Sequence, residues 1–188
     1  MNNIKQEFGE AHSILIQFIS NTENFRKIDI AGSFLIEAFR RKNKAIACGN
    51  GGSMSNAMSF AEGLAGKYRE NRRALPALAI SDPGYLSGAS NNYGYENTFG
   101  RYIEAFGNKD DILLALSTNG NEENMINAMM IAKTKGMKII GLTGRDGGKM
   151  AALCDVEIRA PFSKYSDRTQ EIHIKVIHTL INYVEARL

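Results

Sequence analysis

Apolar positions recur along the chain with two different spacings. Near the N-terminus they follow the three- and four-residue spacing of one helical face, which predicts helices over about residues 4–19 and 23–41. Farther on, short and continuously apolar runs predict buried strands, each followed by a helical segment. The expected strands are 44–47, 77–80, 112–116, 138–143 and 156–160, and the expected helices are 53–65, 85–89, 98–106, 122–135 and 167–187.

This alternation predicts an α/β fold, a doubly wound parallel sheet of five strands covered by helices on both faces. No linker, repeat or low-complexity stretch divides the sequence, so residues 1–188 are expected to form a single domain. The two helices within residues 1–43 carry more apolar surface than the first strand can cover. We therefore expect this N-terminal pair to meet another subunit.

Composition narrows the possible partners and the compartment. A hydrophobic content of 44% supports a continuous core, and a net charge of +3 with mixed signs argues against nucleic acid or a membrane as partner. The first residues carry acid and lack a long apolar run, so neither a signal peptide nor a spanning helix is expected. Cys48 and Cys154 fall at or beside expected strands, where free thiols act as small apolar groups. These features favour a cytoplasmic protein with reduced cysteines.

Two polar glycine loops follow expected strands. The first contains Asn50, Gly51, Gly52 and Ser53, and the second runs from Ser117 through Thr118 and Asn119 to Glu122. In a doubly wound sheet both loops lie at the carboxyl edge, where ligands bind and where helix N-termini favour anions. Neither loop carries the lysine of a nucleotide-binding Walker loop. A sugar phosphate is therefore the preferred ligand, and two ordinary strand-to-helix turns are the structural alternative.

The last expected helix contains three polar residues whose positions differ in phase. Gln170 and His178 are eight residues apart and share a face, whereas His173 points elsewhere. A single histidine on a helix is more often structural than catalytic. The helix phase therefore separates Gln170 and His178 from His173 as candidate site residues.

Several stretches together resemble the phosphoheptose isomerases, a branch of the sugar isomerase (SIS) family, over essentially the whole chain. They are Cys48 to Ser53, Tyr68 to Arg72, Ala79 to Asp82, Leu142 to Gly144, Asp146 to Met150 and Asp167 to His178. The resemblance implies a flavodoxin-like SIS fold and a homotetramer with active sites between subunits. It also implies conversion of sedoheptulose 7-phosphate to a heptose 7-phosphate in carbohydrate metabolism, for lipopolysaccharide heptose biosynthesis.

The same resemblance implies a catalytic site that this chain has altered. Family members place a glutamate base and a histidine on the helix after the first loop, and both join a glutamine and a histidine of the final helix around zinc. Gln170 and His178 keep two of these positions, but Ser59 stands at the histidine position and Gly63 at the glutamate position. Two such ligands make a poor zinc site, so zinc is expected to bind weakly or not at all. His178 is the remaining candidate acid or base.

The substrate-binding residues carried over from the family are spread over four segments. Asn92, Asn119 and Glu122 depart from the family pattern, and Glu122 brings a carboxylate that would repel a phosphate. The full set is Asn50, Gly51, Gly52, Ser53, Asn91, Asn92, Ser117, Thr118, Asn119, Glu122, Asp167 and Gln170.

Three functions are open on the sequence alone. The first is an aldose–ketose isomerase that uses His178 and an unidentified base. The second is a non-catalytic SIS scaffold, which binds a sugar phosphate or pairs with an active paralogue. The DnaA initiator-associating protein, which shares the fold and lacks the catalytic glutamate, is a precedent for this second reading. The third is a protein for a less phosphorylated ligand, suggested by Glu122.

Overall fold

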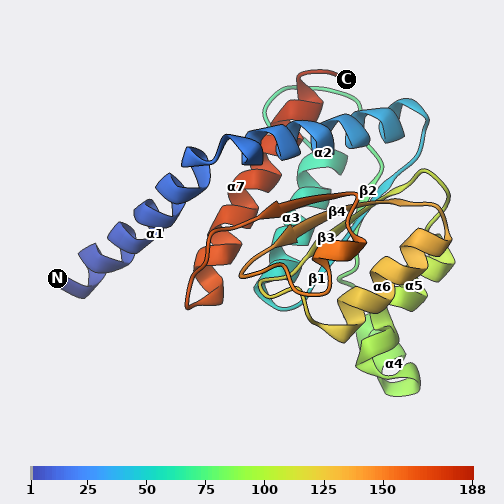
Figure 1. Cartoon of the computed structure of the whole chain (residues 1–188). Coiled ribbons are helices and arrows are strands. Elements are labelled where there is room, and N and C mark those ends of the chain that lie inside the picture. The colour runs from blue at the N-terminus through green and yellow to red at the C-terminus, as the bar shows by residue number, and fades with distance from the viewer. Residues whose placement is uncertain (1) are drawn as a thin grey trace.

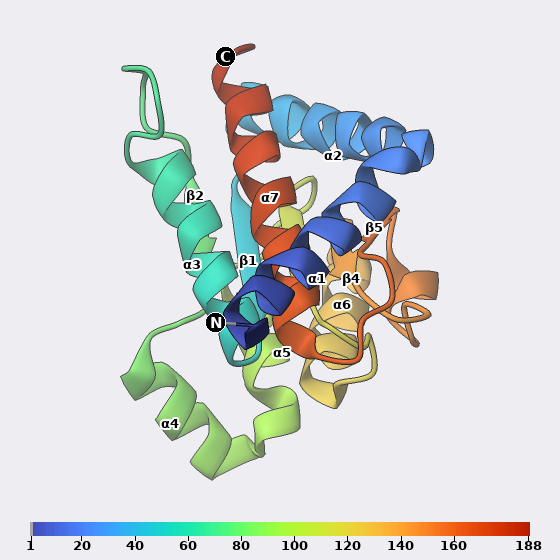
Figure 2. The ribbon, with the colours of Figure 1, turned by 90° about the vertical axis from the view of Figure 1, so that its left-hand side faces the viewer.

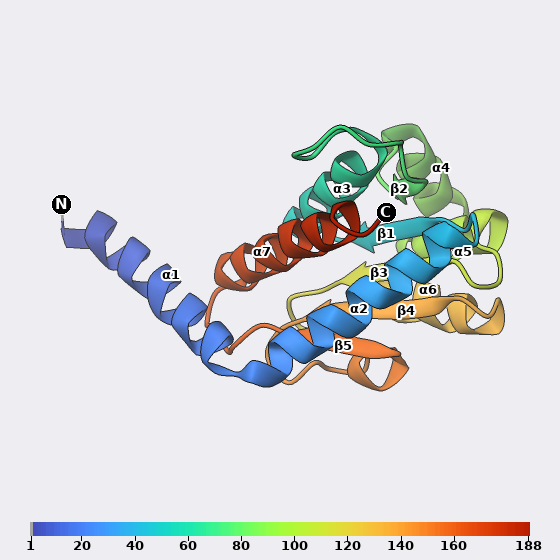
Figure 3. The same cartoon turned by 90° about the horizontal axis from the view of Figure 1, so that it is seen from above.

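A computed structural model describes residues 2–188 as a parallel α/β sheet with helices on both faces (Figure 1). The sheet has five strands in the order β2-β1-β3-β4-β5, with every neighbouring pair parallel. This is the expected fold class, and Figure 3 shows the strands side by side in that order. The strands are β1 Ala45–Gly49, β2 Ala77–Ala79, β3 Ile112–Leu116, β4 Lys138–Thr143 and β5 Val156–Arg159.

The helices agree with the expected segments apart from α4. Gly66 follows α3 as its C-cap, and Gly136 adopts a φ of 73° just after α6, as the glycine positions predict. The helices are α1 Asn2–Ser20, α2 Thr22–Arg40, α3 Gly52–Ala65, α4 Pro83–Tyr93, α5 Thr98–Phe106, α6 Glu123–Thr134 and α7 Ser166–Glu185, with short 3-10 turns at Tyr95–Asn97 and Ala151–Leu153.

Alternate residues of the strands point to opposite faces of the sheet and pack in two separate hydrophobic cores. Side chains such as Leu114 and Ile140 pack with α2, α3 and α7, whereas Leu113 and Ile139 pack with α5 and α6. Both faces of β1, β3 and β4 are thereby covered, which explains why their sequences are continuously apolar. At about 25 cal/mol per Å² of apolar surface, burial on both faces is the dominant stabilising contribution.

Two details of the sequence prediction were wrong. The polar residues 90–93 were expected to lie between two short helices, but they form the last turn of α4. Asp82 starts this helix by accepting from the Tyr85 amide at 2.6 Å, and Pro83 occupies its first turn. Strand β2 was expected to be buried, but it lies at the sheet edge and leaves Leu78 40% exposed.

The N-terminal helices differ in how much of their surface the chain itself covers. Helix α2 packs along α7 and β5, whereas α1 leads away from the sheet beside α7 (Figures 1 and 2). Arg168 of α7, only 6% exposed, is ion-paired with Glu7 of α1 and lies 3.7 Å from Glu10. Within residues 2–188 no helix is long and apolar enough to cross a membrane.

Candidate functional site

The two polar loops leave adjacent strands at the same edge of the sheet. Gly49, at the end of β1, pairs with Leu116, at the end of β3. Strand order reverses between these strands, because β2 follows on one side of β1 while β3 and β4 follow on the other. Figure 2 shows α3 and α7 beginning at this end of the molecule, with α4 beside them. The loops therefore occupy the topological switch point where doubly wound folds bind ligands.

Glycines allow the segments at this edge to approach one another closely. A Cβ at Gly52 would clash with the side-chain amide of Gln170, and a Cβ at Gly144 would lie 2.6 Å from the Thr118 carbonyl oxygen. The Asn56 side chain also donates to the Gln170 carbonyl at 3.0 Å. The first loop, the second loop, the end of β4 and the start of α7 thus form one continuous surface.

Asn50 of the first loop is bonded to the helix that follows the second loop. Its amide exchanges two hydrogen bonds with the Asn124 amide, at 3.0 and 2.9 Å, and its oxygen also accepts from the Tyr95 hydroxyl at 2.7 Å. Asn124 and Tyr95 were not among the site residues predicted from the sequence. Asn124 stands in the first turn of α6, next to the predicted loop, whereas no local sequence signal marks Tyr95.

Several donors of the second loop are hydrogen-bonded within the loop itself. The Ser117 hydroxyl donates to the Glu122 carboxylate and accepts from the amides of Gly120 at 2.7 Å and Asn119 at 3.2 Å. The Asn121 amide donates to the Asn119 side chain at 2.8 Å. Glu122 is the last residue before α6, and its carboxylate does not cap the helix amides.

The other predicted binding residues differ in exposure. Ser53 is buried against Gly49 at the start of α3, whereas Asp167 is exposed at the start of α7 and lies 3.7 Å from Arg168. Asn91 and Asn92 are exposed on the last turn of α4. Their roles in ligand binding stay predictions.

His173 has a structural position, as its helix phase predicts. Its Nε2 donates to the Thr143 carbonyl at 2.9 Å, which joins α7 to the end of β4. The ring is buried, and its Nδ1 has no hydrogen-bond partner within the described chain. Burial lowers the pKa of His173 to about 4, and the bond to Thr143 opposes this shift in part. The imidazole is therefore neutral at neutral pH, and its tautomer carries the proton on Nε2.

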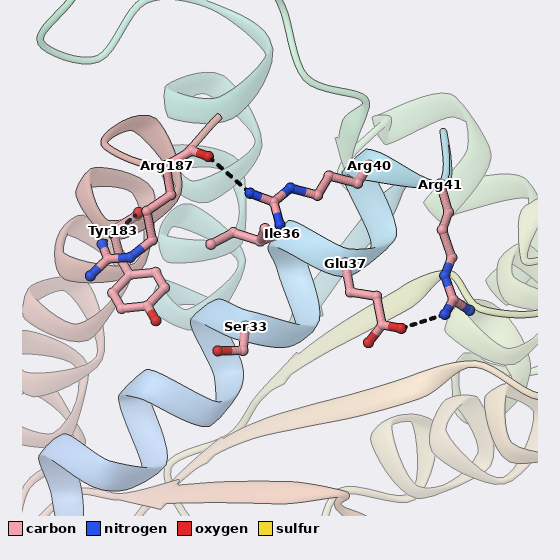
Figure 4. A pocket seen from close by; sticks show the side chains of 7 residues that line it. All are labelled: Ser33, Ile36, Glu37, Arg40, Arg41, Tyr183 and Arg187. Carbon is pink, nitrogen blue, oxygen red and sulfur yellow. Dashed lines mark hydrogen bonds and ion pairs between the residues drawn. The ribbon is translucent and has the colours of Figure 1, made fainter.

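A cavity lies far from the glycine loops, where α2 and α7 end (Figure 4). It has a volume of about 650 Å³ and is lined by Ser33, Ile36, Glu37, Arg40, Arg41, Tyr183 and Arg187. Arg41 pairs with Glu37 at 2.5 Å, and the Arg187 guanidinium stacks over the Tyr183 ring at 3.6 Å. These arginines are therefore already engaged within the chain.

Comparison with known proteins decides the family. A model of the SIS domain matches residues 7–144. The phosphoheptose isomerase of Histophilus somni is 54% identical over 185 residues, which cover 98% of this chain and 95% of that protein. The enzyme of Vibrio cholerae is 50% identical over 98% of this chain and 97% of that protein. This chain belongs to the phosphoheptose isomerase family.

Solved structures of phosphoheptose isomerases also share the fold. The structure from Neisseria gonorrhoeae has a TM-score of 0.91 and 31% identity, and it matches over 98% of each chain. The structure from Francisella tularensis has a TM-score of 0.93 and 29% identity, and it matches over 99% of this chain and 98% of that one. The whole domain, including α1 and α2, therefore follows the architecture of the phosphoheptose isomerases.

Gln170 and His178, which stand at metal positions implied by the phosphoheptose isomerase family, lie toward opposite ends of α3. Gln170 packs on Gly52 at the start of α3, whereas the exposed His178 ring lies 5.8 Å from the Tyr68 ring beyond the end of α3. Eight residues correspond to about 12 Å along a helix. Ser59, between these ends, donates to the Ser55 carbonyl at 3.1 Å. Within residues 2–188, no three His, Cys, Asp or Glu side chains gather where they could hold a metal ion. This donor set does not fit zinc.

Proposed function

We propose that this chain binds a sugar phosphate at the carboxyl edge of its sheet and does not isomerise it with its own side chains. The observation that carries the proposal is the residue at position 63. Gly63 is buried in α3 and faces Ile181 of α7, where the family resemblance implies a glutamate base. Aldose–ketose isomerisation moves a proton between neighbouring carbons, and a glycine has no group that can accept it.

The neighbouring acid does not take the place of the missing base. Glu62 is exposed, and its carboxylate lies toward Gly66 at the end of α3. One residue along a helix turns a side chain by about 100°, so Glu62 and position 63 face different surroundings. His178 remains as one acid or base, and the reaction requires a second group. With Gln170 and His178 as the remaining family ligands, zinc is expected to bind weakly or not at all.

A non-catalytic partner role is the second candidate. It is favoured by the exposed apolar side chains of α1, which include Ile4, Phe8, Ile16 and Ile19. Surfaces of this kind bind other subunits, either copies of this chain in a tetramer or an active paralogue. In this reading the protein acts in the cytoplasm, within the heptose pathway of its family.

An isomerase assay on restored variants tests the proposal. The chain itself, with zinc added, is expected to leave sedoheptulose 7-phosphate unconverted, while the sugar phosphate raises its melting temperature. The double variant Ser59→His with Gly63→Glu is expected to gain turnover, because it returns the two missing side chains. A Cβ at position 63 would lie 2.7 Å from Ile181 Cδ1, the mobile end of a side chain that can shift.

The matched control is Ser59→Asn with Gly63→Gln, which adds similar volume without a base or an imidazole. Turnover by the unmodified chain would overturn the non-catalytic assignment. Failure of sedoheptulose 7-phosphate to protect the fold would overturn the assignment as a binding protein.

A further inference from the structure

Glu122 places a carboxylate in the second loop, where the sequence pattern predicted a phosphate subsite. This carboxylate accepts the proton of the Ser117 hydroxyl. Ser117 Oγ meanwhile accepts from the amides of Gly120 and Asn119. Its one donor and both of its acceptor sites are therefore used within the loop.

Two further donors of the loop are engaged within it. The Asn121 amide donates to Asn119 Oδ1, and the Asn121 side chain donates to the Asn119 carbonyl at 3.1 Å. The Lys149 amide donates to Asn121 Oδ1 at 3.2 Å, which ties the loop to the segment after β4. A phosphate that took these donors would have to break these bonds, and any phosphate in the loop would approach a carboxylate of the same sign.

The two loops at this edge differ in charge. Helix α3 carries no acidic residue in its first turn, whereas Glu122 and Glu123 stand in succession at the start of α6. The backbone dipole of a helix stabilises negative charge at the helix N-terminus. At α6 the Glu122 carboxylate provides this negative charge, so a bound anion is not needed for it. Glu122 is half-buried, which limits screening of its charge by salt.

We propose that Glu122 makes the second loop a subsite for sugar hydroxyl groups and excludes a phosphate from it. A carboxylate accepts hydrogen bonds and cannot donate them, so it suits the O–H groups of a sugar and disfavours phosphate oxygens. This inference rests on the proposed function, because it concerns the orientation and charge of a ligand at the same site. The phosphate of a bound sugar phosphate then lies outside the second loop.

The Glu122→Gln variant tests the inference. The glutamine oxygen can still accept from Ser117, so the loop keeps its bonds while the charge is removed. Binding of sedoheptulose 7-phosphate and of sedoheptulose is measured by calorimetry on the unmodified chain and on the variant. Removing one like charge at close range is expected to raise the affinity for the sugar phosphate about ten-fold or more and to leave that for sedoheptulose unchanged or weaker.

Glu123→Gln is the matched control, since it removes the same charge from an exposed neighbour that holds no loop hydroxyl. Its affinity for the sugar phosphate is expected to change by less than about two-fold. An unchanged or weaker affinity of Glu122→Gln for the sugar phosphate would overturn the inference and leave the proposed function intact. Sugar-phosphate binding by Glu122→Gln alone, with none by the unmodified chain, would support the inference and overturn the proposed function. Binding of neither ligand to any of the proteins would overturn both.

Discussion

At the scale of single residues, His173 links the stability of the protein to pH. Its folded-state pKa of about 4 lies below the usual value of 6.5, because the buried ring is held neutral. Between these values the unfolded chain takes up a proton that the folded chain does not. Stability is therefore fully present above about pH 6.5 and is lost as the pH falls toward 4, by up to roughly 3 kcal/mol from this one group.

His173→Gln is expected to remove this part of the pH dependence, because an amide can still donate to Thr143 and does not titrate. Urea unfolding at pH 7 and at pH 4.5 measures the effect. The free energy of unfolding should fall by roughly 2–3 kcal/mol more in the unmodified protein than in the variant. The control is His178→Gln, which removes an exposed imidazole from the same helix. Equal losses in the unmodified protein and in His173→Gln would contradict the assignment.

Some of the residues at the candidate site were predicted from the sequence and others were not. Helix phase separated His173 from Gln170 and His178, because phase depends only on spacing within one helix. The amide pair between Asn50 and Asn124 joins residues 74 positions apart, and no local pattern contains it. Glu122 was predicted to repel a phosphate, but its bond to Ser117 depends on the shape of the loop.

At the scale of elements, the buried strands were predicted well and α4 was not. A strand covered on both faces is apolar along its buried stretch, so β3 and β4 could be predicted to the residue. Residues 90–93 of α4 lack an apolar face, and only Ala89 of this helix is buried. Its last turns are held by side-chain bonds, such as that of Asn97 to the Tyr93 carbonyl at 2.7 Å. The Asp82-Pro83 pair marks the helix start, whereas the helix was expected to begin at residue 85.

The segment between α3 and β2 is fixed by one buried ion pair. Arg72 and Glu185 meet at 3.2 Å with side chains 8% and 5% exposed. Arg72 also donates to the carbonyls of Gly63 and Leu64, and Glu185 accepts from the amide of Arg69 at 3.1 Å. The pair thereby joins the end of α3, the following loop and the end of α7.

Glu185→Ala is expected to destabilise the fold by roughly 3–5 kcal/mol, because it leaves a buried guanidinium without its partner. The double variant Arg72→Met with Glu185→Leu is expected to lose less, since no buried charge is left unpaired. Urea denaturation at one fixed protein concentration measures both, with the exposed Glu104→Ala as the control. A loss below about 1 kcal/mol for Glu185→Ala would show that solvent or another group compensates the arginine.

At the scale of the whole molecule, α1 carries apolar side chains that the rest of the chain leaves exposed. Arg168 holds Glu7 and Glu10 of α1 against α7, and this arrangement leaves Phe8 75% and Ile4 65% exposed. An exposed apolar stripe on a helix that is fixed in orientation favours burial against another subunit. The apolar pattern of residues 1–43 predicted such a surface, and its burial against another subunit stays a prediction.

Phe8→Glu is expected to separate the subunits, because it puts a charge into the centre of this stripe. Light scattering during size-exclusion chromatography should give an oligomer, a tetramer if the family arrangement holds, for the unmodified chain and a smaller species for the variant. Ser13→Glu adds the same charge at an exposed polar position of α1 and should leave the mass unchanged. A monomeric unmodified protein, or an equal mass for Phe8→Glu, would contradict the role of α1. The family resemblance implies active sites between subunits, so loss of the oligomer in Phe8→Glu should also weaken protection of the fold by the sugar phosphate. A melting-temperature assay on the same samples measures this.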